Sequence, residues 1–150
     1  MTNLDHINAN ILHILQHDGR ISNSELAERV GLSPSACLRR VQELERTGII
    51  KGYRAVIDAE AIGNGLVVYV GVGLSRHLKE DQIAFEAAMG SASQVKECHN
   101  VSGTIEYILR VEVPDLTAYK KFHTEVLGVV KQVMSITSHV VMDSSKDLRA

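Results

Sequence analysis

The chain has 150 residues, of which 45% are hydrophobic and 23% are charged, and it carries a formal net charge of −2. This composition is typical of a folded protein and argues against intrinsic disorder, and the length fits one large domain or two small ones. No apolar run approaches the ~18 residues of a membrane span, and the first residues lack the basic and apolar regions of a secretion signal. We therefore expect a cytoplasmic protein, in which Cys37 and Cys98, far apart and outside any CxxC spacing, stay reduced.

Two helices are predicted at the start of the chain. Apolar residues at helical spacing predict a helix over residues 4–17, which the turn at Gly19 ends. Ser22 is the expected cap of a second helix, with the side chain of Glu25 reaching back to it. Gly31 then makes the turn that leads to the next element.

A third helix has the clearest start and stop signals in the chain. Ser33 is its predicted cap, Pro34 fits its first position, and Gly48 ends it. Residues 49–57 follow as a predicted strand. The expected buried stripe of the third helix is Cys37, Leu38, Val41 and Leu44. The arrangement of two helices around a glycine turn predicts a helix-turn-helix.

The opposite side of this third helix predicts contact with DNA. Residues 33–54 hold five basic and two acidic residues, a net charge of +3, whereas residues 58–150 hold nine basic and twelve acidic residues, a net charge of −3. Arg39 and Arg40 can reach guanine edges or phosphates, and the short side chains of Ser35 and Ala36 allow close approach. The predicted DNA-contacting residues are Ser22, Ser33, Pro34, Ser35, Ala36, Arg39, Arg40, Gln42, Glu43, Lys51 and Arg54. The alternative is a three-helix bundle with a solvated basic face; the combination of caps, turn, stripe and basic segment favours DNA binding.

The periodicity changes after a glycine-containing linker at residues 58–65, which separates a domain at 1–57 from one at 66–150. The second domain is predicted to contain strand 66–74, helix 79–90, strand 94–101, strand 104–113, helix 115–127 and strand 131–142, with a tight hairpin at Ser102-Gly103. This β-α-β-β-α-β order is the ferredoxin-like arrangement, so the fold class is α+β.

Alternation along the predicted strands separates an apolar face from a polar face. The apolar face carries Leu66, Val68, Val70, Val72 and Leu74, together with Ile105, Tyr107, Leu109, Val111 and Val113. The other face carries Val67, Tyr69, Gly71 and Gly73, the set Thr104, Glu106, Ile108, Arg110 and Glu112, and Ser135, Thr137 and His139. Two glycines permit another surface to approach closely, from which we infer a self-associating sheet. Polar groups buried there need partners, which a zwitterionic ligand could supply; pairing of Glu106 with its own neighbours is the alternative.

Segments along nearly the whole chain resemble the Lrp/AsnC (leucine-responsive, feast/famine) regulators. These segments are residues 4–7, 18–23, 26–41, 48–53, 97–103 and 113–116. The resemblance implies a winged-helix-like DNA-binding domain and a ferredoxin-like effector domain. It also implies homodimers that assemble further, often to octamers, with amino-acid effectors bound between dimers.

The resemblance also implies where the effector binds. In this family the hairpin after the second strand carries a Gly-(Asp)-x-Asp-(Tyr/Phe) pattern that lines the effector pocket. Gly103 and Tyr107 match that pattern, whereas Thr104 and Glu106 stand where aspartates are usual. The carboxylate of Glu106 can still pair with the ammonium group of an effector. The predicted effector site is Val101, Ser102, Gly103, Thr104, Ile105, Glu106, Tyr107, Ser135, Thr137 and His139.

Two other functions compete with a DNA-binding regulator that responds to an effector. A ferredoxin-like enzyme could use His99, His123 or His139 as a base, but it would not need the N-terminal third, and no phosphate loop, nucleophile elbow or HExxH motif occurs. A nucleoid-packing protein would bind DNA without an effector. We expect a sequence-specific transcription regulator of the cytoplasm, associated with the nucleoid, that binds double-stranded DNA and no membrane. We expect no catalytic residue, no metal and no cofactor.

Overall fold

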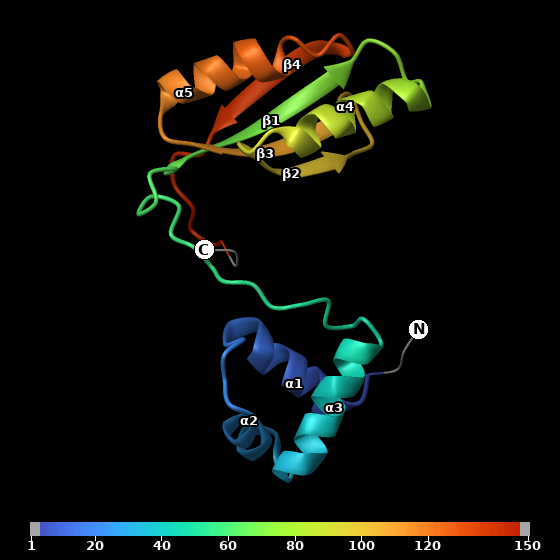
Figure 1. Cartoon of the computed structure of the whole chain (residues 1–150), viewed down its shortest axis with the longest axis vertical. Helices are drawn as coiled ribbons and strands as arrows, with labels where there is room; N and C mark the ends of the chain where they lie inside the picture. Colours follow the sequence, from blue (N-terminus) through green and yellow to red (C-terminus); the bar gives the residue numbers. More distant parts are fainter. Residues whose placement is uncertain (1–3, 148–150) are drawn as a thin grey trace. The chain divides into compact units, whose positions relative to one another are not determined.

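The computed structural model describes residues 4–147 and divides the chain into two compact units, with the division between Ala55 and Val56. Figure 1 draws the first unit in blue to cyan and the sheet-containing unit in green to red. Within the described residues, no helix has both the length and the apolar character needed to cross a membrane.

The first unit is a bundle of three helices, α1 (His6–His17), α2 (Asn23–Val30) and α3 (Pro34–Arg46). Each begins after a residue whose side chain accepts a hydrogen bond from a backbone N–H three positions on: Asp5 (2.7 Å), Ser22 (3.2 Å) and Ser33 (3.3 Å). Such caps satisfy donors that the first helical turn leaves unpaired. The core of the unit is formed by Ile11, Leu26, Ala27, Cys37 and Leu44. The three predicted helices and the caps Ser22 and Ser33 are thus confirmed.

Three expectations for this unit are wrong in detail. The carboxylate of Glu25 accepts from Arg29 on the next turn (2.6 Å) and does not reach back to Ser22. Leu38, predicted to be buried, is 46% exposed. Residues 49–57 form no strand. A strand needs hydrogen bonds to a neighbouring strand. The regular elements in the described part of the first unit are all helices, so residues 49–57 have no strand to pair with.

The second unit is a four-stranded antiparallel sheet with helices in the predicted β-α-β-β-α-β order. Its elements are β1 (Leu66–Leu74), α4 (Lys79–Ser91), β2 (Val95–Asn100), β3 (Tyr107–Val113), α5 (Leu116–Lys121), the π-helical turn η1 (Phe122–Leu127) and β4 (Val133–Val140). The strands lie side by side in the order β2-β3-β1-β4. The ferredoxin-like, α+β prediction is therefore confirmed.

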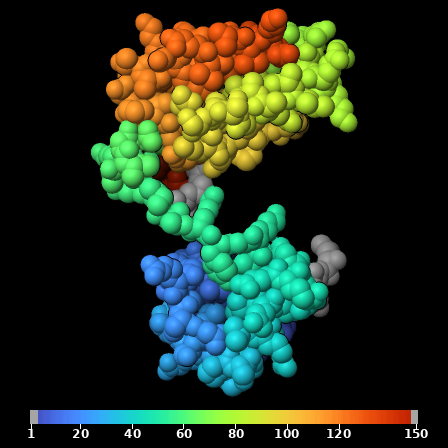
Figure 2. Space-filling view, in the orientation of Figure 1, coloured from blue at the N-terminus to red at the C-terminus, as the bar shows by residue number. Residues whose placement is uncertain are grey.

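One face of this sheet is covered by the helices. Val68, Val70, Val72 and Leu74 from β1, and Tyr107, Leu109, Val111 and Val113 from β3, are buried in one core with Phe85, Met89, Tyr119, Phe122 and Leu127 from the helices. In Figure 2 the side chains of α4 and α5 form a continuous layer that hides most of the strands from this side. The predicted division of the strands into an apolar and a polar face is confirmed along β1 and along β3 from Tyr107 onward. On β4 only Val133 and Ile136 pack against the core, whereas Met134 and Val140 are 70% and 43% exposed.

The opposite face carries no helix from the described residues, and we refer to it as the helix-free face. The register places Tyr69 of β1 between Arg110 and His139, and Gly71 between Ile108 and Thr137.

The connection between β2 and β3 differs from the predicted two-residue hairpin. It spans residues 101–106 and is closed by a bond from the N–H of Val101 to the carbonyl of Glu106 (2.9 Å). Because the strand alternation starts only at Tyr107, Ile105 lies over the helix-free face, where a Cβ added to Gly71 would approach its Cδ1 to 2.9 Å. A Cβ on Gly73 would overlap with the hydroxyl of Ser135. Side chains of the same chain therefore occupy the space above both glycines, where we expected another surface.

Candidate DNA-contacting face and effector site

The exposed side of α3, which we call its free face, is formed by Ser35, Leu38, Arg39, Gln42, Glu43 and Arg46. Its orientation is set by the buried side chains Cys37 and Leu44 on the other side of the helix. Asn23 of α2 donates from its amide nitrogen to the carbonyl of Pro34 (2.9 Å) and so ties the start of α3 to α2. Gly31 makes the turn between the helices with a φ of 71°, a conformation that costs glycine little. Ala36, predicted to face DNA, is half-buried.

The two adjacent arginines of α3 have different surroundings. Arg40 donates from Nη1 to the carboxylate of Asp5 (2.6 Å) and to the side-chain oxygen of Asn8 (3.0 Å), so it is held against the start of α1. The pKa of Asp5 is lowered, first by the backbone N–H of Asn8 and then by Arg40. Arg39 is exposed and has no hydrogen bond or ion pair to any described residue. Arg39 is therefore unpaired on the free face of α3, whereas Arg40 is bound within the protein.

Glu43, also predicted to face DNA, binds another residue of α3. Its carboxylate accepts two hydrogen bonds from Arg46 (2.6 and 2.8 Å). The hydrogen bond from Arg46 is the main reason that the pKa of Glu43 is lowered. Arg46 was absent from the predicted contact residues, although its position three residues after Glu43 on the exposed side of the helix already indicated this pair.

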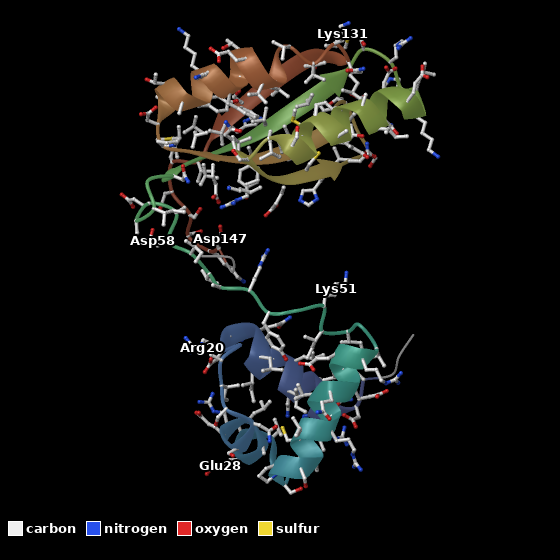
Figure 3. The ribbon with its side chains drawn as sticks, in the orientation of Figure 1. Arg20, Glu28, Lys51, Asp58, Lys131 and Asp147 are labelled. Carbon is white, nitrogen blue, oxygen red and sulfur yellow. The ribbon has the colours of Figure 1, made fainter. Side chains whose placement is uncertain are left out.

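The basic residues after α3 lie on an extended, exposed segment. Lys51 and Arg54 are exposed, and Lys51 extends away from the helices in Figure 3. Between them, Tyr53 donates from its hydroxyl to Glu45 near the end of α3 (2.9 Å), and its ring lies against Gly19. Burial and Glu45 together raise the pKa of Tyr53. Tyr53 thus anchors the segment that carries both cations.

In the second unit, the carboxylate of Glu106 is bound within the chain. Oε2 accepts from the backbone N–H of Leu74 (2.6 Å), and Oε1 lies 3.2 Å from Nδ1 of His77. The Glu106 side chain is 14% exposed, whereas Ser135, Thr137 and His139 on β4 are exposed. Of the two possibilities for Glu106, the structure shows the second, in which its carboxylate pairs with neighbouring residues of the same chain.

The predicted effector residues do not all come together. Tyr107 points into the core, where its hydroxyl donates to Glu86 (2.7 Å) and its ring lies 4.6 Å from that of Phe85. Burial is the main reason that its pKa rises to about 12. Tyr107 is therefore on the opposite side of the sheet from Glu106. The remaining predicted residues lie in the connection (Val101, Ser102, Gly103, Thr104 and Ile105) or on the helix-free face (Ser135, Thr137 and His139).

The residues that hold Glu106 were not among those predicted from the sequence. His77 lies three residues after the end of β1, and Arg76 beside it donates a hydrogen bond to Asp81 (2.9 Å). Asp81 is 3% exposed, the one charged residue in the described chain that is fully buried. Once the register is known, the end of β1 lies beside residue 106, and this proximity could have suggested His77 as its partner.

Another charged pair lies on the helix-free face. Arg110 of β3 donates to Glu112, and both side chains are only 13% and 14% exposed. For residues 4–147, no group of three or more histidine, cysteine, aspartate or glutamate side chains is arranged to hold a metal ion.

Comparisons with known proteins match both units. Residues 4–51 match a family described as winged helix-turn-helix DNA-binding, and residues 67–150 match the Lrp/AsnC ligand binding domain. The chain is 44% identical over 143 residues to the leucine-responsive regulatory protein of Salmonella typhimurium, covering 95% of this chain and 87% of that protein.

Solved structures agree with these matches. A transcriptional regulator from Neisseria meningitidis in complex with L-methionine is similar with a TM-score of 0.92 and 34% identity, over 97% of this chain and 94% of that one. A feast or famine regulatory protein from M. tuberculosis complexed with L-methionine is similar with a TM-score of 0.86 and 30% identity, over 96% and 95% of the two chains.

Proposed function

The chain belongs to the Lrp/AsnC family of DNA-binding transcription regulators, and from this premise we propose that α3 reads a specific DNA sequence and that an amino acid bound to the second unit modulates DNA binding or assembly. The family consists of regulators and not of enzymes. The function follows from the first unit, which binds DNA, and the second unit, which has the ligand-binding fold.

The observation that carries the DNA-reading proposal is the unpaired guanidinium of Arg39 on the free face of α3. A recognition helix places its N-terminal residues at base edges in the major groove. Arginine suits guanine because its planar group can donate to O6 and N7 together. The first N–H groups of α3, beside Ser33 and Pro34, can hold a phosphate, and Lys51 and Arg54 can neutralise neighbouring phosphates.

Fluorescence anisotropy with a duplex enriched from a random pool tests this proposal. Arg39→Ala should weaken binding to the enriched duplex by about 1–3 kcal/mol, roughly 5- to 150-fold, and relax the base preference at one position. Lys51→Ala should weaken binding to all duplexes alike and lower the salt dependence. Lys131→Ala removes the same charge from the second unit and serves as the control. Equal affinities for the wild type and Arg39→Ala would refute the assignment.

We place the effector at the helix-free face beside the connection 101–106. Oε2 of Glu106 is occupied by a backbone N–H, so an effector ammonium would compete with His77 for Oε1. Two structural relatives were solved with L-methionine, and a close relative in sequence is named for leucine. These two amino acids are therefore the first candidates.

A thermal-shift measurement with L-methionine, L-leucine and their D-enantiomers tests the effector, because a ligand that binds only the folded protein raises Tm. We expect a shift with an L-amino acid that Glu106→Gln loses. A binding protein that packs DNA without an effector is the second candidate, since Glu106 is already satisfied within the chain. A null result with both L-amino acids, and unchanged DNA affinity in their presence, would favour that candidate.

We further propose that homodimers form and assemble to larger oligomers such as octamers. Paired first units would then occupy half-sites about one helical turn of DNA apart. Such a protein acts on DNA in the cytoplasm, at the nucleoid. The proposed units are residues 1–57 and 66–150, joined by a linker at 58–65.

A further inference from the structure

The free face of α3 includes a large apolar side chain that the bundle does not use. Leu38 is 46% exposed. On the side of α3 that faces the bundle, Cys37 and Leu44 are buried at 0% and 2%, and Val41 packs against the same core. The position of Leu38, four residues from both Pro34 and Gln42 and three from Ser35, places it among the residues that a recognition helix turns toward DNA.

The neighbours of Leu38 limit what it can do at that surface. Arg40 is held away by Asp5 and Asn8, and Arg46 is neutralised by Glu43. The N-terminal half of the free face therefore presents one unpaired cation, Arg39, beside one exposed aliphatic side chain. A leucine neither donates nor accepts hydrogen bonds, so it cannot read the polar edge of a base.

In the major groove, the C5-methyl group of thymine is the apolar feature that distinguishes one base pair from the others. We infer that Leu38 reads a thymine methyl group, next to the base pair or phosphate that Arg39 contacts. This inference rests on the proposed reading of DNA by α3 and adds a second specificity residue to it. Contact with the methyl group removes apolar surface of both partners from water, which favours thymine over the other bases at that position.

The test uses the full-length protein and a duplex enriched from a random pool, with each thymine of the half-site replaced in turn by deoxyuridine. This replacement removes only the methyl group. At one position we expect the affinity of the wild type to fall about fourfold, the change that corresponds to one buried methyl-sized contact. Leu38→Ala should bind the thymine duplex more weakly and should lose the preference for thymine over deoxyuridine, whereas Leu38→Met should keep it.

Leu116→Ala is the matched control, because Leu116 is 63% exposed and belongs to α5 of the second unit, whereas Leu38 belongs to α3 of the first unit. This control variant should keep the full response to deoxyuridine. The melting temperature and the affinity for an unrelated duplex show whether Leu38→Ala remains folded. If no deoxyuridine replacement affects the wild type more than Leu38→Ala, the inference is wrong while the reading of DNA by α3 stands. If the pool yields no preferred sequence, sequence-specific reading itself fails, and the inference fails with it.

Discussion

The adjacent residues Arg39 and Arg40 differ in what they contact within the protein, and we expect them to have different roles for this reason. Both arginines stand on the polar side of α3 in the sequence, which led us to expect that both face DNA. Asp5 and Asn8 lie just before and in the first turn of α1, and they draw Arg40 to the edge of the bundle. A guanidinium with two oxygen acceptors within the protein stabilises the fold, so Arg40 joins α1 to α3.

Arg40→Ala should therefore lower the melting temperature of the first unit and change base preference little. The reason is that Asp5 and Asn8 lose their partner while the free face of α3 stays intact. Calorimetry of the variant and binding to the enriched duplex check this, with Arg39→Ala as the comparison. A variant that melts like the wild type but loses base preference would place Arg40 on DNA instead.

The same contact predicts a dependence on pH. The pKa of Asp5 is lower in the folded state than its ordinary value of 3.8, so the folded state favours the ionised carboxylate. Its stabilising effect is present above the unfolded pKa and is lost as the pH falls through the lower, folded pKa. Asp5→Asn should reduce the melting temperature at neutral pH, and the gap to the wild type should close below about pH 4. A gap that stays constant from pH 7 to pH 3 would contradict this.

Tyr107 shows how a resemblance can mislead about a single residue. Its place in the hairpin pattern suggested a pocket residue, but strand alternation turns its ring into the core beside Phe85. Tyr107→Phe should cost about 1 kcal/mol in unfolding free energy, as for a typical lost hydrogen bond, and should leave any effector response unchanged. Because its folded pKa is raised to about 12, its stabilising effect is complete below pH 10 and is lost as the pH rises toward 12. Denaturant titrations of the wild type and the variant at pH 7 and pH 11 measure both effects.

At the scale of elements, the sequence predicted correctly those features that depend on residues close together in the chain, such as helix starts and the faces of a strand. Ser22 and Ser33 mark the starts of α2 and α3 because a cap needs only its own helix turn. The alternation of residues in β1 correctly predicted which face the helices cover, because successive side chains of a strand always point to opposite faces of the sheet. Residues 49–57 have a composition that favours a strand but do not form one, because a strand also needs a neighbouring strand and the described first unit contains none.

The prediction of a two-residue hairpin between β2 and β3 was wrong for a related reason. Ser102-Gly103 has the composition of a tight turn, but the backbone N–H of Glu106 bonds to the carbonyl of Val72 and its side chain to the N–H of Leu74. These contacts with β1 are distant in sequence, and they hold the connection in a longer form. The partners of Glu106 could not be predicted from the sequence for the same reason, because His77 and Leu74 lie about 30 residues earlier in the chain.

The helices differ in how well their starts are capped. The residue before α4, Leu78, makes no side-chain hydrogen bond to the first turn, unlike the caps of α2 and α3. Leu78→Ser should supply an acceptor there and raise the unfolding free energy of the second unit by about 1 kcal/mol. Ser33→Ala should lower that of the first unit by a similar amount. Chemical denaturation followed by circular dichroism compares the two, and a destabilised Leu78→Ser would mean that packing of Leu78 outweighs the missing cap.

At the scale of the whole molecule, the helix-free face is the surface that the proposed assembly depends on. Its polar side chains alternate with half-buried apolar ones, among them Val67, Ile105 and Ile108, and Ile108 of β3 lies opposite Gly71. The pair of Arg110 and Glu112 is already largely shielded from water in one chain. Such a pair needs little further desolvation when another surface covers it, which suits a face that meets a second copy.

Ile108→Glu should therefore disrupt assembly. In a single chain the carboxylate added at this half-buried position can turn toward water. In the proposed dimer the carboxylates of both subunits would be buried in the interface without a cation to pair with, which costs several kcal/mol. Light scattering after size exclusion should give a smaller mass than that of the wild type, and the affinity for a duplex with two half-sites should fall toward that for one. Ile83→Glu on α4 makes the same change at a residue that is 56% exposed on the covered side of the sheet, and it should keep the wild-type mass. If Ile108→Glu keeps that mass as well, the subunits associate through another surface, and the two reading helices must be joined by a different part of the chain.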